Sequence, residues 1–210
     1  MRLVGTRDEI MEELTALCPS VPHVLASART GVVQNKRQIE EFQAAALYVL
    51  THPFYRGNAL EIGTFYGYST VVLAHAVYRG TVTTLNNHHA EVVYARERLG
   101  PRYKNVTVLE RCSWEYLEEY EGPWLDVVFV DGDHNRVRHD LPWFNWLNVG
   151  GLMLFHDYTP LGAPRHCPPV YEALNEMRET LGHGFDVRVI DNDKVGMVGF
   201  YRKEGETWEG

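Results

Sequence analysis

The sequence predicts an α/β protein whose mostly parallel sheet carries helices on both faces and ends in an antiparallel hairpin. From residue 59 onward, short apolar runs alternate with helical patterns, which is typical of βαβ units. The runs are bounded by Gly, Asn or Asp, as strands of a buried sheet usually are. Near the C-terminus, Asp186–Ile190 and Val195–Tyr201 flank a polar turn, which indicates a hairpin.

The N-terminal region is predicted to be helical. Residues 7–17 form one candidate helix, and residues 34–51 form a second, in which apolar side chains such as Ile39 and Phe42 recur at helical spacing. His52-Pro53 then interrupts the pattern. We therefore expect a helical cap over residues 1–56, packed as one compact unit with a main domain over residues 57–210.

The main domain contains five strand candidates before the hairpin, each a short apolar run. They are Ala59–Ile62, Val82–Leu85, Val106–Leu109, Val127–Val130 and Leu152–Phe155. The segments between and after them have helical patterns, which gives candidate helices at 68–78, 89–98, 113–120, 135–147 and 168–181. This order predicts parallel strands joined by helical crossovers.

Composition narrows the classes of partner and compartment. The chain has 210 residues and a formal net charge of −8, and no Lys/Arg cluster stands out, so we expect no nucleic-acid partner. The three cysteines lack CxxC spacing, which argues against a disulfide framework or a zinc site and favours a reducing, cytoplasmic setting. No apolar stretch approaches the ~20 residues of a membrane span, so we expect no membrane association.

The loop after the first core strand is the first candidate binding site, because ligands of open α/β sheets lie beyond the carboxyl ends of the strands. It contains Gly63 and Gly67, four positions apart, which let the backbone pass close to a ligand. The spacing fits neither the dinucleotide G-x-G-x-x-G pattern nor a P-loop. Glu61 beside the loop would repel a pyrophosphate and suits a cationic ligand.

The stretch from Leu60 to Ser69 (LEIGTFYGYS) closely resembles motif I of the class I S-adenosylmethionine-dependent methyltransferases. It looks especially like the small-molecule O-methyltransferases related to catechol O-methyltransferase and to the macrolide-sugar methyltransferases. The resemblance covers about residues 34–202. It implies a Rossmann-like fold, with a seven-stranded, mostly parallel sheet whose terminal strand is antiparallel, and S-adenosylmethionine as cofactor of the main domain.

The resemblance also implies which residues hold that cofactor. The implied set spans the first loop, the ends of the second and fourth strands, and the segment after the third: Glu61, Gly63, Thr64, Tyr66, Gly67, Ser69, Asn86, Ser113, Trp114 and Asp131. Ser113 would contact the adenine edge, and Trp114 would either stack on the ring or pack under the next helix. The chain departs from the family where an acid usually holds the ribose, because Leu85 and Asn86 align there. Either Asn86 or Asn87 substitutes as a neutral partner, or cofactor binding is weakened.

Polar side chains follow two further strands. Asp131, Asp133 and His134 come after the fourth strand, and His156 and Asp157 end the fifth. Neighbouring parallel strands lie about 5 Å apart, so the two groups should meet at one cleft. Burying so many titratable groups is costly unless they are paired, metal-bound or functional. For Asp133, a cap of the following helix is an equally weighted reading.

The resemblance assigns roles within this cluster. In metal-dependent relatives the matching positions bind a divalent cation, which implies Asp131, His156 and Asp157 as ligands of Mg²⁺, Mn²⁺ or Fe²⁺. Tyr158 stands where the catechol-type enzymes have Asn, so His156 is the substitute ligand. His134 stands where they have a catalytic Lys and would serve as base, with Asp131 as the second catalytic residue.

The expected function is O-methylation of a small hydroxylated molecule. One alternative is an altered or inactive methyltransferase-fold binding protein, which the Asn86 departure favours and the intact polar cluster disfavours. Another is a metal-dependent hydroxylase-like relative. Residues 157–170, rich in proline, are expected to form a stiff lid, with Gln34 and Arg165 as weaker candidates for polar contacts. A homo-oligomer is a further expectation.

Overall fold

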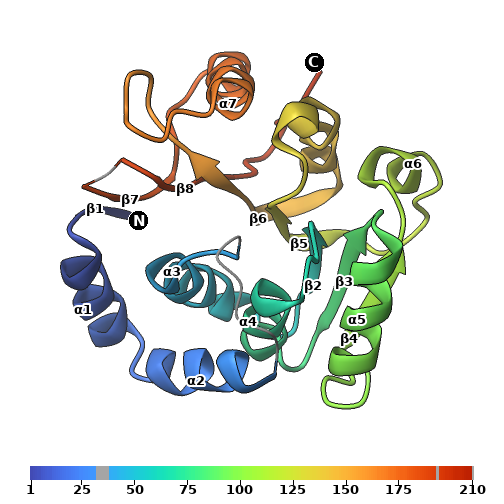
Figure 1. Ribbon diagram of the computed structural model, residues 1–210. Coiled ribbons are helices and arrows are strands. Elements are labelled where there is room, and N and C mark those ends of the chain that lie inside the picture. Colours follow the sequence, from blue (N-terminus) through green and yellow to red (C-terminus); the bar gives the residue numbers. More distant parts are fainter. Residues whose placement is uncertain (32–37, 193, 210) are drawn as a thin grey trace.

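The computed structural model describes residues 1–31, 38–192 and 194–209, which form an eight-stranded sheet between two helical layers (Figure 1). The strands are β1 (Arg2–Gly5), β2 (Asn58–Ile62), β3 (Thr81–Asn86), β4 (Val106–Glu110), β5 (Leu125–Val130), β6 (Leu147–Tyr158), β7 (Val187–Asp191) and β8 (Gly196–Tyr201). The α-helices are α1 (Arg7–Leu17), α2 (Val21–Gly31), α3 (Glu41–Thr51), α4 (Tyr68–Ala76), α5 (His89–Leu99), α6 (Ser113–Glu118) and α7 (Pro168–Leu181). Three short 3₁₀ segments complete the order: η1 (His52–Phe54), η2 (His134–His139) and η3 (Leu141–Trp146).

The strand order is β1-β7-β8-β6-β5-β2-β3-β4. All neighbouring pairs are parallel except those of β8, which runs antiparallel to both β6 and β7. This confirms the mostly parallel sheet and the terminal hairpin expected from the sequence. The chain winds outward from β2 to β4 on one side and continues from β5 on the other. The carboxyl ends of β2 and β5 therefore mark the switch point where open α/β sheets bind ligands.

Two apolar clusters fill the space between the sheet and its helices. One cluster joins α1 to α5 to one face of the sheet, and it includes Leu14, Leu25, Phe42, Leu73 and Ala95. The other joins η2, η3 and α7 to the opposite face, with Trp143 and Phe144 at its centre. Figure 1 shows the same division, with α1 to α4 below the sheet and α7 above it. The helices on both faces thus pack against the strands whose ends form the site.

The structure adds a strand to the seven that the resemblance implied. Strand β1 pairs in parallel with β7, with Arg2 opposite Arg188, so the N-terminus forms one edge of the sheet beside the C-terminal hairpin (Figure 1). Four residues without an alternating pattern give no strand signal by themselves. Pairing with a partner that is distant in the sequence stabilises them as a strand.

Two helix predictions need correction. The predicted helix 34–51 is α3 and begins only at Glu41, and the unpredicted α2 precedes it; residues 34–37 lie outside the described part of the chain. The predicted helix 135–147 is instead η2 and η3, separated at Asp140. Pro142 explains the break, because its ring clashes with the preceding turn and it has no N–H to donate within an α-helix.

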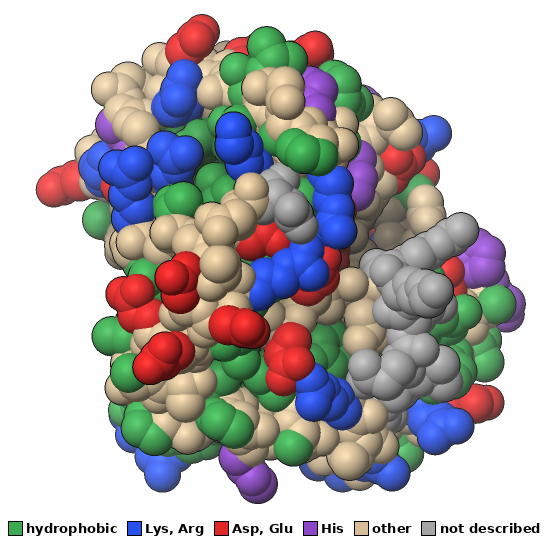
Figure 2. Space-filling view, turned by 60° about the vertical axis from the view of Figure 1, so that its left-hand side comes forward, with side chains coloured by type: hydrophobic (Ala, Val, Ile, Leu, Met, Phe, Trp, Pro, Cys, Tyr) green, Lys and Arg blue, Asp and Glu red, His purple; other side chains and the backbone are tan. Residues whose placement is uncertain are grey.

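Charged side chains of both signs are interspersed on the face seen in Figure 2, where acidic and basic groups lie directly against each other near the centre. Three ion pairs join oppositely charged side chains from distant parts of the chain. Glu40 contacts both Arg7 and Arg165, and Arg7 also contacts the buried Asp191.

Within the described residues, none of the helices has the length and apolar character needed to cross a membrane.

Candidate functional site

A cavity of about 310 Å³ opens at the carboxyl ends of the central strands. Its volume lies at the lower end of the range of small-molecule sites. Its wall is built from the loop after β2, the end of β3, the start of α5 and of α6, the segment after β5, and the end of β6. Of the predicted cofactor and catalytic residues, those on the wall are Gly63, Thr64, Tyr66, Ser69, Asn86, Ser113, Trp114, Asp131 and His134. The structure thus brings most of the predicted residues to one cavity.

Glycine is required at both positions that sequence analysis singled out in the first loop. Gly63 has a φ of 106°, and a Cβ there would lie 2.2 Å from the backbone oxygen of Asp131. Gly67 has a φ of 86° and serves as the N-cap of α4, packed against Leu99. Gly63 therefore allows the loop after β2 to touch the loop after β5, which narrows the cavity at the switch point.

Glu61 lies behind this loop, fully buried in the sheet. Its Oε2 accepts hydrogen bonds from the hydroxyl groups of Thr70 and Thr84, and Thr64 in turn donates to Thr84 at 2.6 Å. Its Oε1 has no hydrogen-bond partner among the described residues. Burial raises the pKa of Glu61 to about 7, against the opposing effect of hydrogen bonds from the surrounding hydroxyl groups. Glu61 is thus placed to hold β2, β3 and α4 together beneath the loop.

The opposite end of the cavity is formed by the segment that starts α6. Ser113 is buried and donates a hydrogen bond to the carboxyl group of Asp140, which is also buried and lines the cavity. Burial raises the pKa of Asp140 to about 7. Trp114 lies on the wall, with the guanidinium carbon of Arg136 5.0 Å from the centre of its ring. Stacking of the Trp114 ring on a ligand stays a prediction.

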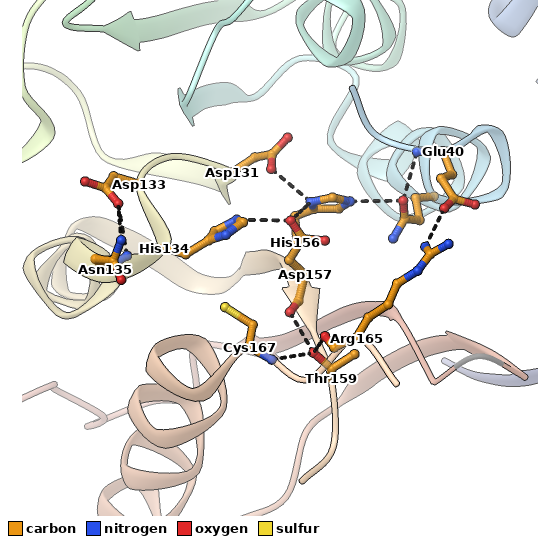
Figure 3. A network of polar contacts seen from close by, with 11 residues as sticks. Glu40, Asp131, Asp133, His134, Asn135, His156, Asp157, Thr159, Arg165 and Cys167 are labelled. Carbon is orange, nitrogen blue, oxygen red and sulfur yellow. Dashed lines mark hydrogen bonds and ion pairs between the residues drawn. The ribbon is translucent and has the colours of Figure 1, made fainter. Parts of the chain in front are cut away.

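Four polar side chains meet beside the cavity, as the strand-end pattern predicted (Figure 3). His156 Nδ1 lies 2.9 Å from Asp131 Oδ1 and 3.1 Å from Asp157 Oδ2. His134 Nε2 lies 3.0 Å from the same Asp157 oxygen. Asp131, His134 and Asp157 are on the cavity wall, whereas His156 lies in a second layer and is almost buried. We refer to these four residues as the strand-end cluster.

The hydrogen bonds of Gln43 determine which ring nitrogen of His156 carries the hydrogen in the neutral imidazole. Gln43 Oε1 accepts a hydrogen bond from the backbone N–H of Glu40 at 2.8 Å, which identifies this atom as the side-chain oxygen. His156 Nε2 lies 3.0 Å from the same oxygen and must therefore carry a hydrogen. In a neutral imidazole, Nδ1 then keeps its lone pair, and this atom faces the carboxylates of Asp131 and Asp157. No pattern in the sequence predicted this role of Gln43.

The charges of the strand-end cluster reinforce one another. Burial opposes protonation of His156, but the carboxylates of Asp131 and Asp157 outweigh it and raise its pKa to about 10. Burial alone would raise the pKa of Asp157, yet hydrogen bonds from His134 and His156 hold it well below its usual range. The hydrogen bond to Asp157 likewise raises the pKa of His134. Without a cation, the imidazolium of His156 offsets part of the negative charge of Asp131 and Asp157.

The donor set of the cluster suits a divalent cation. Ligand atoms of Asp131, His156 and Asp157 all lie within 4.8 Å of one another, and Nδ1 of His156 is the ring nitrogen that faces the two carboxylates. Two carboxylates and one imidazole favour Mg²⁺, Mn²⁺ or Fe²⁺. The Nε2–H bond to Gln43 is the kind of outer contact that orients a metal-binding histidine. These residues therefore fit the metal that the resemblance implied.

Asp133 also lies on the cavity wall, but its carboxylate has a local role. Asp133 caps η2, with its carboxylate accepting from the backbone N–H of Asn135 at 3.0 Å, which is the alternative role considered from the sequence. Arg165 forms an ion pair with Glu40, 2.9 Å away, which ties the loop between β6 and α7 to the start of α3. Gln34 lies outside the described residues. Glu91 also lies on the cavity wall, although no sequence pattern predicted it there.

Comparisons with known proteins find methyltransferases among the proteins similar to this chain. Residues 60–158 match the model of a family described as a methyltransferase domain, and a search of curated proteins gives no match. Among solved structures, the chain is similar to the O-methyltransferase from Bacillus cereus in complex with SAH, with 19% identity, a TM-score of 0.65, and 89% of this chain and 91% of that chain covered. It is equally similar to TomG from Streptomyces achromogenes, an O-methyltransferase involved in tomaymycin synthesis and solved in complex with SAM, with 19% identity, a TM-score of 0.65, and 87% and 89% covered. At such identities the likeness shows the fold.

Proposed function

We propose that this chain is a class I S-adenosylmethionine-dependent methyltransferase that transfers a methyl group to a hydroxyl oxygen of a small molecule. The match of residues 60–158 to a methyltransferase-domain family and the fold shared with solved methyltransferases support this proposal. The O-methyltransferases that it resembles in structure support the choice of oxygen as acceptor. We further propose that a divalent cation takes part in the reaction.

One observation carries the proposal: a single cavity joins the glycine loop after β2 to the strand-end cluster. Gly63 and Asp131 touch at the point where the two parts meet. A cofactor on the loop would therefore present its methyl group close to Asp131, His134 and Asp157. Methyl transfer needs mainly such alignment, because holding two reactants in line removes much of the entropic barrier.

His134 is placed to remove the acceptor proton. Its Nε2–H donates to Asp157 Oδ2, which leaves Nδ1 as the nitrogen that accepts a proton. The carboxylate orients the ring and stabilises the imidazolium that forms, as an acid does beside a histidine base. The oxygen then forms a bond to the methyl carbon while the carbon–sulfur bond of the sulfonium breaks, and the proton stays on His134.

Asp131, His156 and Asp157 would hold the cation. When bound there, it would lower the pKa of the acceptor hydroxyl group and so assist His134. The buried position of His156 and its bond to Gln43 keep the imidazole in one orientation for this role.

Isothermal titration calorimetry with S-adenosylmethionine and S-adenosylhomocysteine (SAH), each with and without Mg²⁺, tests the proposal. We expect both compounds to bind the wild-type protein. If neither compound binds, the proposed methyltransferase function is refuted. Binding without any effect of Mg²⁺, Mn²⁺ or Fe²⁺ on a methyl-transfer assay with hydroxylated acceptors would refute the role of the metal and leave the transfer itself standing.

A further inference from the structure

A carboxylate from α5 lies beside the end of β3, where the sequence has no acidic residue. Strand β3 ends in the neutral Asn86, but Asn86 Nδ2 donates a hydrogen bond of 2.8 Å to Glu91 Oε2. Asn86 Oδ1 accepts from the backbone N–H of His88 at 3.0 Å. Both ends of the amide are therefore bound to the chain, and this fixes the amide toward Glu91. Asn86 and Glu91 both line the cavity.

The carboxylate of Glu91 keeps most of its capacity to accept hydrogen bonds. Among the described residues, Asn86 is the side chain that donates to it, whereas an ionised carboxylate has about four lone-pair sites. Its Oε1 is 3.8 Å from His88 Nδ1, beyond hydrogen-bond distance. The Glu91 side chain is 21% exposed, so it is partly shielded from water yet open to the cavity.

The position of Glu91 along the sheet indicates which part of a bound cofactor would lie beside it. Strand β3 lies between β2 and β4. A ligand that reaches from the glycine loop after β2 to Ser113 and Trp114 after β4 must cross the end of β3, where Asn86 and Glu91 lie. In S-adenosylmethionine, the group between the methionine and the adenine is the ribose.

A ribose has two adjacent hydroxyl groups, and one carboxylate accepts hydrogen bonds from both. In nucleotide-binding α/β sheets, an acidic residue roughly 20 residues after the glycine loop commonly does so. Glu91 follows Gly67 by 24 residues. The other carboxylates on the wall are unsuited to this contact. Asp131, Asp133 and Asp157 come from beyond β2 on the opposite side, and Asp140 is buried against Ser113.

We propose that Glu91 is the residue that binds the ribose hydroxyl groups of the cofactor, with Asn86 as the residue that positions it. This inference rests on the proposed function, because it presumes that the cavity binds S-adenosylmethionine. It assigns the missing acid of β3 to a helix five residues further along the chain.

Calorimetry with SAH on Glu91→Gln tests the inference, because glutamine keeps the size of the side chain and removes its charge. We expect SAH to bind roughly 10- to 100-fold more weakly, as is usual when a charged hydrogen-bond partner is neutralised. Glu97→Gln is the matched control, because Glu97 lies on the exposed side of the same helix, α5. We expect it to bind SAH as the wild type does.

The 2′-deoxy and 3′-deoxy analogues of SAH separate a direct contact from a structural effect. Loss of a hydroxyl group from SAH should weaken binding to the wild type. It should have much less effect on the affinity of Glu91→Gln, because the carboxylate that accepts from that hydroxyl group is already removed. An equal loss in both proteins would overturn the inference, as would unchanged SAH affinity in Glu91→Gln while the wild type binds. If the wild type binds neither SAH nor S-adenosylmethionine, the proposed function and this inference both fall.

Discussion

Asp131 connects the two halves of the site at the scale of a single residue. Its side chain contacts His156, and its backbone oxygen lies against Gly63. We expect Asp131→Asn to bind Mg²⁺ at least about 100-fold more weakly, because even removal of an outer partner of a metal ligand costs roughly 10- to 100-fold. A methyl-transfer assay at varied Mg²⁺ measures this change.

Asp133→Asn is the control for that experiment, because Asp133 lies two residues away and its carboxylate turns toward Asn135 (Figure 3). It should keep the metal dependence of the wild type. If Asp131→Asn also keeps it, Asp131 is not a ligand.

Glu61 makes stability depend on pH. Its pKa is raised from 4.5 to about 7 in the folded protein, so the folded state retains a proton that the unfolded state releases between these values. Stability should therefore fall as the pH rises from about 4.5 to 7, by up to about 3 kcal/mol from this group. Glu61→Gln removes this dependence.

Urea unfolding of both proteins between pH 5 and pH 8 measures the effect of Glu61. We expect the stability of Glu61→Gln to increase relative to the wild type as the pH rises. A difference between the two proteins that stays constant across this range would show that Glu61 is ionised throughout.

At the scale of elements, the loop after β2 depends on Gly63. Alanine there would place Cβ 2.2 Å from the Asp131 backbone oxygen, at a φ of 106° that alanine rarely adopts. We expect Gly63→Ala to destabilise the fold by about 3 kcal/mol or more and to abolish SAH binding. Thermal unfolding and calorimetry test both effects.

Gly182→Ala separates the steric contact of a new Cβ from the backbone strain of a positive φ. Gly182 has a φ of 70°, and a Cβ there would meet nothing within 4 Å. This variant should cost only the backbone strain, about 1 kcal/mol, and bind SAH normally. Similar losses in the two variants would mean that the contact with Asp131 is unimportant.

The sequence predicted the elements whose signals are local. Alternating apolar runs predicted β2 to β6 and the hairpin, and the glycine spacing of the loop after β2 predicted a ligand site where the structure has a cavity. The sequence did not predict β1, because its partner Arg188 is far away along the chain. It also missed α2, which begins with Val21 and Pro22 and is stabilised by packing of side chains such as Leu25.

The same reasoning applies to the site. The strand ends placed Asp131, His134, His156 and Asp157 together, because neighbouring parallel strands must align their ends. Gln43 and Glu91 come from helices, and their side-chain directions depend on packing between elements. An acid 24 residues after Gly67 was the one available signal for Glu91.

At the scale of the whole molecule, Glu40 joins parts that are far apart in the sequence. It forms ion pairs with Arg7 at the start of α1 and with Arg165 in the loop before α7. We expect Glu40→Gln to loosen that loop, so that its amide hydrogens at Ala163, His166 and Cys167 exchange up to about fivefold faster. This corresponds to the modest energy of partly exposed ion pairs.

Hydrogen-exchange mass spectrometry of the loop, with Glu41→Gln as control, tests this expectation. Glu41 is the next residue and pairs with Arg29 of α2 instead. Equal exchange rates in Glu40→Gln and the wild type would show that the hydrogen bonds of Thr159 hold the loop without help from Glu40.

Gln43 belongs to α3, near the start of the chain, whereas the histidine that it orients lies at the far end of β6. An engineer who exchanges residues 1–56 for those of another protein, in order to change which acceptor is accommodated, would also replace the partner that sets the tautomer of His156. If the strand-end cluster binds a cation as proposed, such chimeras would bind it more weakly for a reason unrelated to acceptor fit. Keeping a glutamine at this helical position would separate the two effects.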